Sequence, residues 1–90
     1  MTTADTKRTQ RIGFLLVQNF ALMSYASAVE PLRAANVLAG RELYRWQHVA
    51  VEGTSIAASN GIHIAADHAV GGEVFPDMIV VCAGGNPARF

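Results

Sequence analysis

Two unbroken apolar runs constrain the fold of this chain more than any other feature. The first spans residues 12–17 (IGFLLV), and the second spans residues 78–83 (MIVVCA). A half-exposed strand alternates apolar and polar residues, whereas a strand buried on both faces is apolar throughout. Both runs therefore predict central strands of a parallel sheet that is covered on its two faces.

A long helical segment follows the first run. Residues 20–40 are rich in Ala and Leu, and they end on Gly40, which suits the position after a helix. Pro31 lies in the middle, where it removes a backbone hydrogen bond and clashes with the preceding turn. We therefore predict two helical pieces, with Glu30 at the junction. Strand, short turn and helix together form the first half of a βαβ unit.

The rest of the chain divides into shorter predicted elements. The content of β-branched and aromatic residues in segment 43–52 predicts a second strand, parallel to the first. Asn60-Gly61 within residues 54–66 is a strong signal for a β-hairpin with a type I′ turn. We expect Ile56, and Ile62 or Ile64, to be its buried contacts. Residues 67–75 are predicted to be a loop or a short helix, residues 76–85 a strand, and residues 1–10 a disordered tail.

Composition limits the classes of function. Seven basic and seven acidic side chains cancel, so the chain carries no overall charge that would favour nucleic acid or an anionic membrane. A single cysteine excludes an internal disulfide and fits a cytoplasmic protein. No apolar run is long enough to span a membrane. At 90 residues and 51% hydrophobic, the chain is expected to form a homo-oligomer, such as a dimer, or to be part of something larger.

Five segments, in this order, resemble one protein family: RIGFLLVQNF (11–20), SAVEPLRAAN (27–36), AGRELYRW (39–46), ASNG (58–61) and PDMIVVCAGG (76–85). The chain is similar to the first half of a PfpI-type domain of the class I glutamine amidotransferase-like superfamily. Within that superfamily it most resembles the ligand-sensing N-terminal domain of AraC-family transcriptional regulators.

The resemblance implies an α/β fold of the flavodoxin-like or Rossmann-like type, with three layers, a mostly parallel sheet and an inserted hairpin. Residues 11–90 would supply the N-terminal half of that domain. It implies a non-catalytic sensing and dimerisation part of a regulator that responds to a small amine or amino acid. The family's DNA-binding helix-turn-helix region has no counterpart in this chain. The alternative is a fragment of a PfpI-type cysteine-dependent enzyme, a protease, deglycase or hydratase, whose reactive Cys and His would lie beyond Phe90.

The candidate ligand-binding residues gather where the predicted strands end. Ligands of open parallel sheets bind at the carboxyl ends of the strands, and the resemblance places a helix glutamate and a glycine pair there. Glu30 would face this pocket; the alternative is a surface ion pair with Arg33. Glycine N–H groups there would hold a carboxylate; the alternative is a plain turn. The candidate set is Asn19, Phe20, Glu30, Gly84, Gly85 and Asn86.

We predict no catalytic residue, metal or cofactor in these 90 residues. Cys82 lies inside an apolar run without a neighbouring cation, so it is expected to be buried and unreactive. His48, His63 and His68 lack metal-ligand spacing. Trp46 is expected to anchor the core or an interface, or to form an aromatic wall for a cationic ligand.

Overall fold

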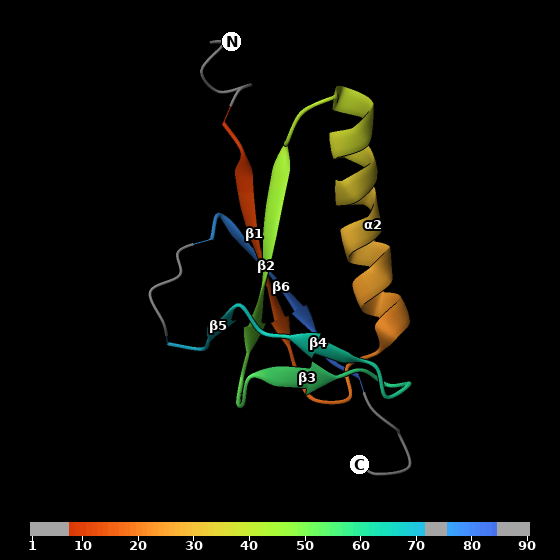
Figure 1. Cartoon of the computed structure of the whole chain (residues 1–90), viewed down its shortest axis with the longest axis vertical. Helices are drawn as coiled ribbons and strands as arrows, with labels where there is room; N and C mark the ends of the chain where they lie inside the picture. Colours follow the sequence, from red (N-terminus) through yellow and green to blue (C-terminus); the bar gives the residue numbers. More distant parts are fainter. Residues whose placement is uncertain (1–7, 72–75, 85–90) are drawn as a thin grey trace.

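The computed structural model describes residues 8–71 and 76–84, and these residues form one helix and six strands (Figure 1). The elements are β1 (Gln10–Leu16), α2 (Leu22–Ala39), β2 (Tyr44–Ala50), β3 (Ser55–Ala57), β4 (His63–Ala65), β5 (His68–Ala69) and β6 (Met78–Cys82). Of the predicted disordered tail, residues 1–7 lie outside the described part. β1 begins at Gln10, one residue before the predicted boundary.

A four-stranded parallel sheet with the order β5-β2-β1-β6 forms the frame of the molecule. β1 lies inside the sheet, where Phe14 pairs with His48 of β2 on one side and with Val80 of β6 on the other. The predicted strands are present as β1, β2 and β6. The expectation that residues 78–83 form a central strand covered on both faces is not met within the described residues, because β6 lies at the edge of the sheet and Ile79 and Val81 are 62% and 60% exposed. The predicted α/β class with a mostly parallel sheet is confirmed.

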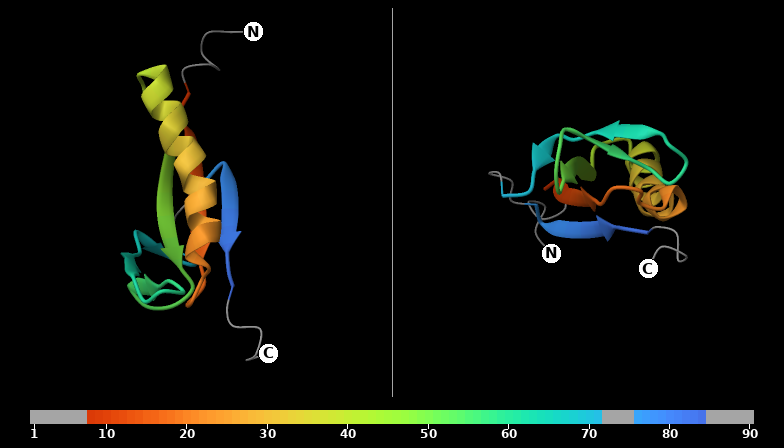
Figure 2. Two further views of the ribbon diagram at one scale, coloured as in Figure 1. Left: turned by 90° about the vertical axis from the view of Figure 1, so that its right-hand side faces the viewer. Right: turned by 90° about the horizontal axis from the view of Figure 1, so that it is seen from below.

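The helix α2 runs along one face of this sheet, between β2 and β6 (Figure 2). Alternate residues of β1, namely Ile12, Phe14 and Leu16, point toward it and are at most 4% exposed. Val29 of α2 packs against them. Burial of large apolar side chains such as Phe14 contributes about 1.5–3 kcal/mol each. The hydrophobic core consists of Ile12, Phe14, Leu16, Phe20, Val29, Ala50, Ile56, Ala58 and Cys82.

The prediction of two helical pieces is wrong, because α2 continues unbroken through Pro31. Pro31 has no N–H to donate to the carbonyl of Ser27, one turn earlier. Both residues lie on the exposed side of the helix, so water can hydrogen-bond the freed carbonyl. The buried side of α2, which carries Val29, packs on the sheet without interruption. That packing outweighs the local cost of the proline.

Local hydrogen bonds fix where α2 ends and where the chain re-enters the sheet as β2. Gly40 adopts a left-handed conformation (φ 70°), and its N–H bonds to the carbonyls of Asn36 and Val37. The Asn36 side chain then accepts hydrogen bonds from the N–H groups of Leu43 and Tyr44 at 2.7 and 3.0 Å, and donates to the Tyr44 carbonyl at 2.9 Å. One side chain thereby fixes where β2 begins.

The predicted hairpin is present as β3 and β4, which pair antiparallel across the carboxyl end of the sheet (Figure 1). Ile56 is 1% exposed, as expected, and Ile64 packs against the core. The predicted type I′ turn is wrong. Gly61 has positive φ (92°), but Asn60 does not, and its side chain instead accepts the Ile62 N–H at 3.1 Å. The Ala58 N–H donates to the Ile62 carbonyl at 2.7 Å, so residues 59–61, with one left-handed glycine, replace the two-residue turn.

The prediction for residues 67–75 also needs correction. His68 and Ala69 form the short strand β5, which pairs in parallel with Val49 and Ala50 of β2. A strand of two residues is too short to be predicted from sequence. It forms here because the edge of β2 has unpaired backbone groups that β5 can pair with. Residues 72–75 lie outside the described part. Within residues 8–71 and 76–84, no helix is long and apolar enough to cross a membrane.

Candidate ligand site at the carboxyl end of the sheet

The turn from β1 into α2 forms one side of the candidate site. Asn19 adopts a left-handed conformation (φ 67°), which Asn tolerates better than most residues. Its N–H donates to the Ala57 carbonyl at 2.7 Å, while its side chain is exposed. The left-handed residue lets the chain reverse within a few positions, and it leaves a polar side chain at the rim of the sheet.

The end of β6 forms the other side. The N–H of Ala21 donates to the Ala83 carbonyl at 3.2 Å, and Gly84 packs directly on the backbone of Ala21. A Cβ atom at Gly84 would lie 2.7 Å from the Ala21 nitrogen, which is shorter than real Cβ contacts. The structure therefore brings the segment around Asn19 and Gly84 to one rim. The candidates Gly85 and Asn86 lie outside the described residues.

The hairpin holds the β1–α2 turn in place. The Gln18 side chain donates to the Ser55 carbonyl at 3.1 Å and accepts the Ala57 N–H at 3.0 Å. Ser59 donates its N–H to the Phe20 carbonyl at 2.8 Å. Its hydroxyl accepts the Leu22 N–H at 3.2 Å, which supplies the cap that Ala21 at the helix start cannot provide. Sequence reasoning identified the hairpin but missed this role.

Phe20 lies beneath the rim rather than on it. Its side chain is 0% exposed, and its ring meets the Tyr25 ring edge to face at a centroid distance of 5.8 Å. Its packing role is therefore clear: it fills the core under the turn that carries Asn19. Contact between the Phe20 ring and a ligand stays a prediction.

Glu30 lies further along α2. It is eight residues beyond the first helical residue, which is about 12 Å at the rise of an α-helix. Its side chain is 57% exposed, and its Oε2 lies 2.5 Å from Nε of Arg33. This is the ion pair that the sequence offered as the alternative, and the unbroken helix gives Glu30 no junction to occupy. The structure does not bring Glu30 to the rim with Asn19 and Gly84, and its role toward a ligand stays a prediction.

A polar chain that sequence reasoning missed joins α2, β2 and the connection between β4 and β5 close to this end of the sheet. The Tyr25 hydroxyl of α2 lies 2.7 Å from Nε2 of His48 on β2. Asp67, just before β5, accepts the His48 backbone N–H at 2.7 Å, and its carboxylate is 3.7 Å from Nδ1 of the same ring. The tautomer with its proton on Nδ1 suits both neighbours, because Nε2 then accepts the Tyr25 proton. Tyr25 and Val29 are four residues apart and therefore lie on the same buried side of α2. This spacing was the sequence signal that could have predicted that Tyr25 faces the sheet.

Burial is the main cause of the pKa shifts of Tyr25 and His48. Desolvation raises the pKa of Tyr25, and the charges of Cys82, Asp67 and Glu30 raise it further. Desolvation lowers the pKa of His48, while the Asp67 carboxylate opposes that shift. Both side chains are therefore held neutral near pH 7. The Tyr25–His48 pair acts as a neutral hydrogen bond inside an aromatic cluster that includes Phe14.

Cys82 is buried, as predicted. It is 2% exposed, it is a free thiol, and burial raises its pKa. A thiol needs a lowered pKa and access to solvent to act as a nucleophile, and Cys82 has neither. Within the described residues, no group of three His, Cys, Asp or Glu side chains is placed to hold a metal ion.

Solved structures define the class of fold. The chain is similar to an AraC family transcriptional regulator from Pseudomonas putida, with a TM-score of 0.75 and 23% identity over 84% of this chain and 48% of that one. It is also similar to a DJ-1 superfamily protein from Agrobacterium tumefaciens, with a TM-score of 0.60 and 22% identity over 84% of this chain and 38% of that one. The chain therefore shares its fold with these two proteins, which agrees with the predicted flavodoxin-like class.

In sequence, the chain is similar to transcriptional regulators. The HTH-type transcriptional regulator GlxA of Rhizobium meliloti is 55% identical over 86 residues, which are 94% of this chain and 26% of that protein. GbdR of Pseudomonas aeruginosa, also an HTH-type transcriptional regulator, is 49% identical over 80 residues, or 89% of this chain and 22% of its own length. The predicted resemblance to such regulators is confirmed, and the chain spans about a quarter of their length. No protein-family model matches the chain.

Proposed function

We propose that this chain forms part of the ligand-sensing and dimerisation domain of an AraC-type transcriptional regulator. The observation that carries the proposal is the 49–55% identity with two helix-turn-helix regulators across about nine tenths of the chain. DNA would be bound through a helix-turn-helix region outside these 90 residues, and the protein would act in the cytoplasm.

The proposed effector site is the rim built from Asn19 and Gly84. A parallel sheet presents its ligand site at this edge, and glycine N–H groups at a strand end would suit a carboxylate. Gly85 and Asn86 continue the chain from Gly84 and complete the proposed site. Glu30 would contribute negative charge toward a cationic group. A small amine or amino acid matches this combination.

The proposed domain acts without catalysis. Cys82 is the single cysteine of the chain, and its burial and raised pKa make it unsuitable as a nucleophile. Likeness to a DJ-1 superfamily protein is the one observation that favours the enzyme alternative. That alternative requires a reactive Cys at a strand-to-helix elbow, followed by a His, in the sequence after Phe90. A coding sequence with that pair and no helix-turn-helix region would contradict the regulator proposal.

Binding can be tested with small amines and amino acids on the protein encoded by the complete gene, with the melting temperature and the affinity for its promoter DNA as the two readouts. An effector should raise the melting temperature with increasing concentration and change DNA affinity. E30Q should weaken the response to a cationic effector, whereas E42Q, which removes the carboxylate of a similar i,i+3 ion pair before the start of β2, should not. If no compound in the screen alters either readout, the sensing proposal is wrong.

A further inference from the structure

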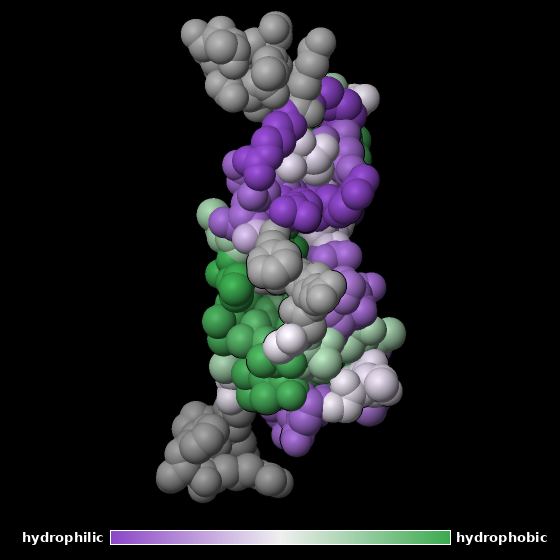
Figure 3. Space-filling model, turned by 90° about the vertical axis from the view of Figure 1, so that its left-hand side faces the viewer, coloured by the Kyte–Doolittle hydropathy of each residue, from purple (hydrophilic) through white to green (hydrophobic). Residues whose placement is uncertain are grey.

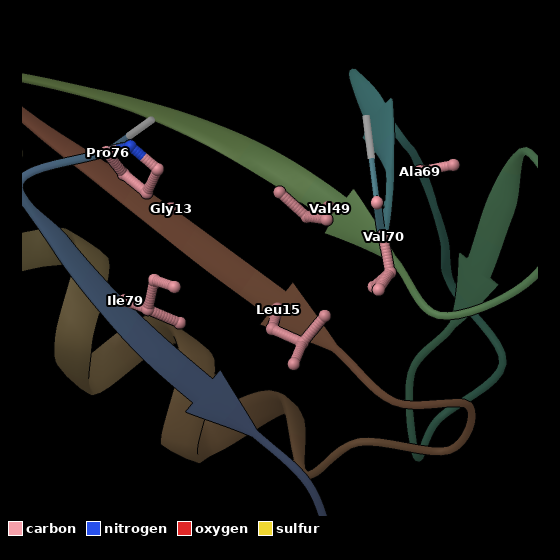
Figure 4. A pocket seen from close by; sticks show the side chains of 8 residues that line it. Gly13, Leu15, Val49, Ala69, Val70, Pro76 and Ile79 are labelled. Carbon is pink, nitrogen blue, oxygen red and sulfur yellow. The ribbon is translucent and has the colours of Figure 1, made fainter. Parts of the chain in front are cut away.

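The outer edge of β2, on the side away from β1, is paired with another strand only at its end. Successive residues of a strand direct their backbone N–H and C=O groups to opposite edges. The Leu43 carbonyl accepts the N–H of Gln10 in β1 at 2.9 Å, so the odd-numbered residues of β2 face β1. The outer edge therefore carries the backbone groups of Tyr44, Trp46, His48 and Ala50. β5 covers it only beside the last two residues of β2, near Val49 in Figure 4.

Two side chains close most of the remaining edge. The Asn36 amide accepts the Tyr44 N–H at 3.0 Å and donates to the Tyr44 carbonyl at 2.9 Å, as the backbone of a neighbouring strand would. The Asp67 carboxylate accepts the His48 N–H at 2.7 Å, and the Asp67 N–H donates to the His48 carbonyl at 2.7 Å. Trp46 lies between these two positions, and within the described residues its outward N–H and C=O have no such partner.

Without Asn36 and Asp67 this edge would be complementary to itself. A strand edge with free backbone groups is a template for a strand of another chain. If a second copy lay antiparallel with its Trp46 opposite Trp46, its His48 would lie opposite Tyr44 and its Tyr44 opposite His48. Each of these residue pairs would exchange two hydrogen bonds. With both side chains in place, only the Trp46 pair can form, so the two strands cannot continue their ladder.

Backbone hydrogen bonding, rather than apolar contact, controls association at this edge. Figure 3 shows the hydrophobic area of the sheet face toward its carboxyl end, whereas hydrophilic residues surround the amino end, where β2 begins. The neighbours of Trp46 in the strand are Arg45 and Gln47, and the Arg45 side chain is 63% exposed and paired with Glu42. Apolar burial therefore offers little to a second copy here, and the unpaired backbone groups decide the outcome.

We propose that Asn36 and Asp67 guard the outer edge of β2, so that a second copy of the chain cannot add its own β2 there. Association of two copies is thereby restricted to other surfaces of the molecule. This inference goes beyond the sensing function and does not depend on the identity of the effector.

Disulfide crosslinking between two copies tests the proposal. In the antiparallel arrangement centred on Trp46, residue 45 of one copy lies opposite residue 47 of the other, at a Cα–Cα distance of about 4.5 Å that a disulfide can span. Chains carrying R45C are mixed with chains carrying Q47C and oxidised with a copper catalyst. The mixture should give at least about fivefold more linked dimer when both chains also carry N36A/D67A than when the edge is intact.

Two controls accompany the mixture. D67N keeps an oxygen that accepts the His48 N–H, so its yield of linked dimer should stay within about twofold of the intact edge. R45C alone and Q47C alone should crosslink less than the mixture, because neither residue lies opposite its own copy in this arrangement.

Two results would overturn the proposal. One is equal crosslinking with the intact and the opened edge. The other is the absence of crosslinking in an N36A/D67A chain that unfolds cooperatively. If that double variant does not fold, D67A alone is compared with D67N, because it frees His48 beside Trp46 and leaves Asn36 in place. More linked dimer in D67A than in D67N supports the proposal, and equal yields contradict it.

Discussion

The Tyr25 hydroxyl lies 2.7 Å from Nε2 of His48, and this contact fastens α2 to the second strand of the sheet. The two residues are 23 positions apart, and their rings pack at a centroid distance of 5.5 Å. Asp67 adds a backbone hydrogen bond to His48 from the segment before β5. Helix, sheet and the connection after the hairpin thus meet at one polar chain inside an otherwise apolar layer.

Removing the Tyr25 hydroxyl should destabilise the chain. Y25F keeps the ring but leaves Nε2 of His48 without this partner, and a lost hydrogen bond in a half-buried place costs about 1 kcal/mol. Urea unfolding of Y25F, H48Q and the double variant forms a double-mutant cycle. A coupling energy of at least about 0.5 kcal/mol is expected. Additive effects of the two substitutions would show that the contact contributes nothing to stability.

His48 should make the stability of the chain depend on pH. Burial lowers its pKa in the folded state below the ordinary value of 6.5. At a pH between the His48 pKa of the folded chain and that of the unfolded chain, the unfolded chain binds more protons. The contribution of neutral His48 to stability is therefore fully present above pH 6.5. It is lost as the pH falls through the His48 pKa of the folded chain. Urea midpoints measured between pH 7.5 and 5 should show this slope. H48Q should reduce the slope, and an unchanged slope would contradict the assignment to His48.

Gly84 should tolerate no side chain, because its Cα packs on the backbone of Ala21. In G84A the added methyl group would meet the Ala21 nitrogen at 2.7 Å, and such overpacking costs about 1–3 kcal/mol. G71A is the matched control, since Gly71 also has positive φ (90°) but no neighbouring atom within 4 Å of the added Cβ. Thermal unfolding should show a larger loss for G84A than for G71A. Equal losses would mean that backbone conformation alone decides the effect.

Replacing Pro31 should stabilise α2. In P31A the residue regains an N–H that can donate to the Ser27 carbonyl, and the helix loses the steric clash of the ring. The expected gain in the free energy of unfolding is about 1–2 kcal/mol, after part of the intrinsic difference is offset by the more flexible unfolded chain. S27A, one turn earlier on the same exposed side, controls for helix propensity alone. Destabilisation of P31A would show that the proline serves a packing role.

Local sequence was sufficient for the elements whose signal lies within a few residues. The apolar runs at residues 12–17 and 78–83 predicted two strands of a parallel sheet, because apolar runs without alternation are typical of such sheets. Burial of the run was correct for β1, whereas Ile79 and Val81 of β6 are exposed. Asn60-Gly61 placed the hairpin, since few other residues reverse a chain so tightly. Burial of Cys82 followed from its apolar neighbours. The family resemblance rested on ordered motifs of the same local kind.

Tertiary structure decided the features that depend on residues distant in sequence. Whether Pro31 breaks α2 depended on its facing solvent, and whether His68 and Ala69 form a strand depended on the free edge of β2. The contact of Tyr25 with His48 exists only because α2 crosses back over the sheet. Sequence periodicity determines which face of an element is apolar, but the partner of that face is set by how the elements pack. The rim at Asn19 and Gly84 was predicted from the strand ends, whereas the position of Glu30 away from that rim became visible only in three dimensions.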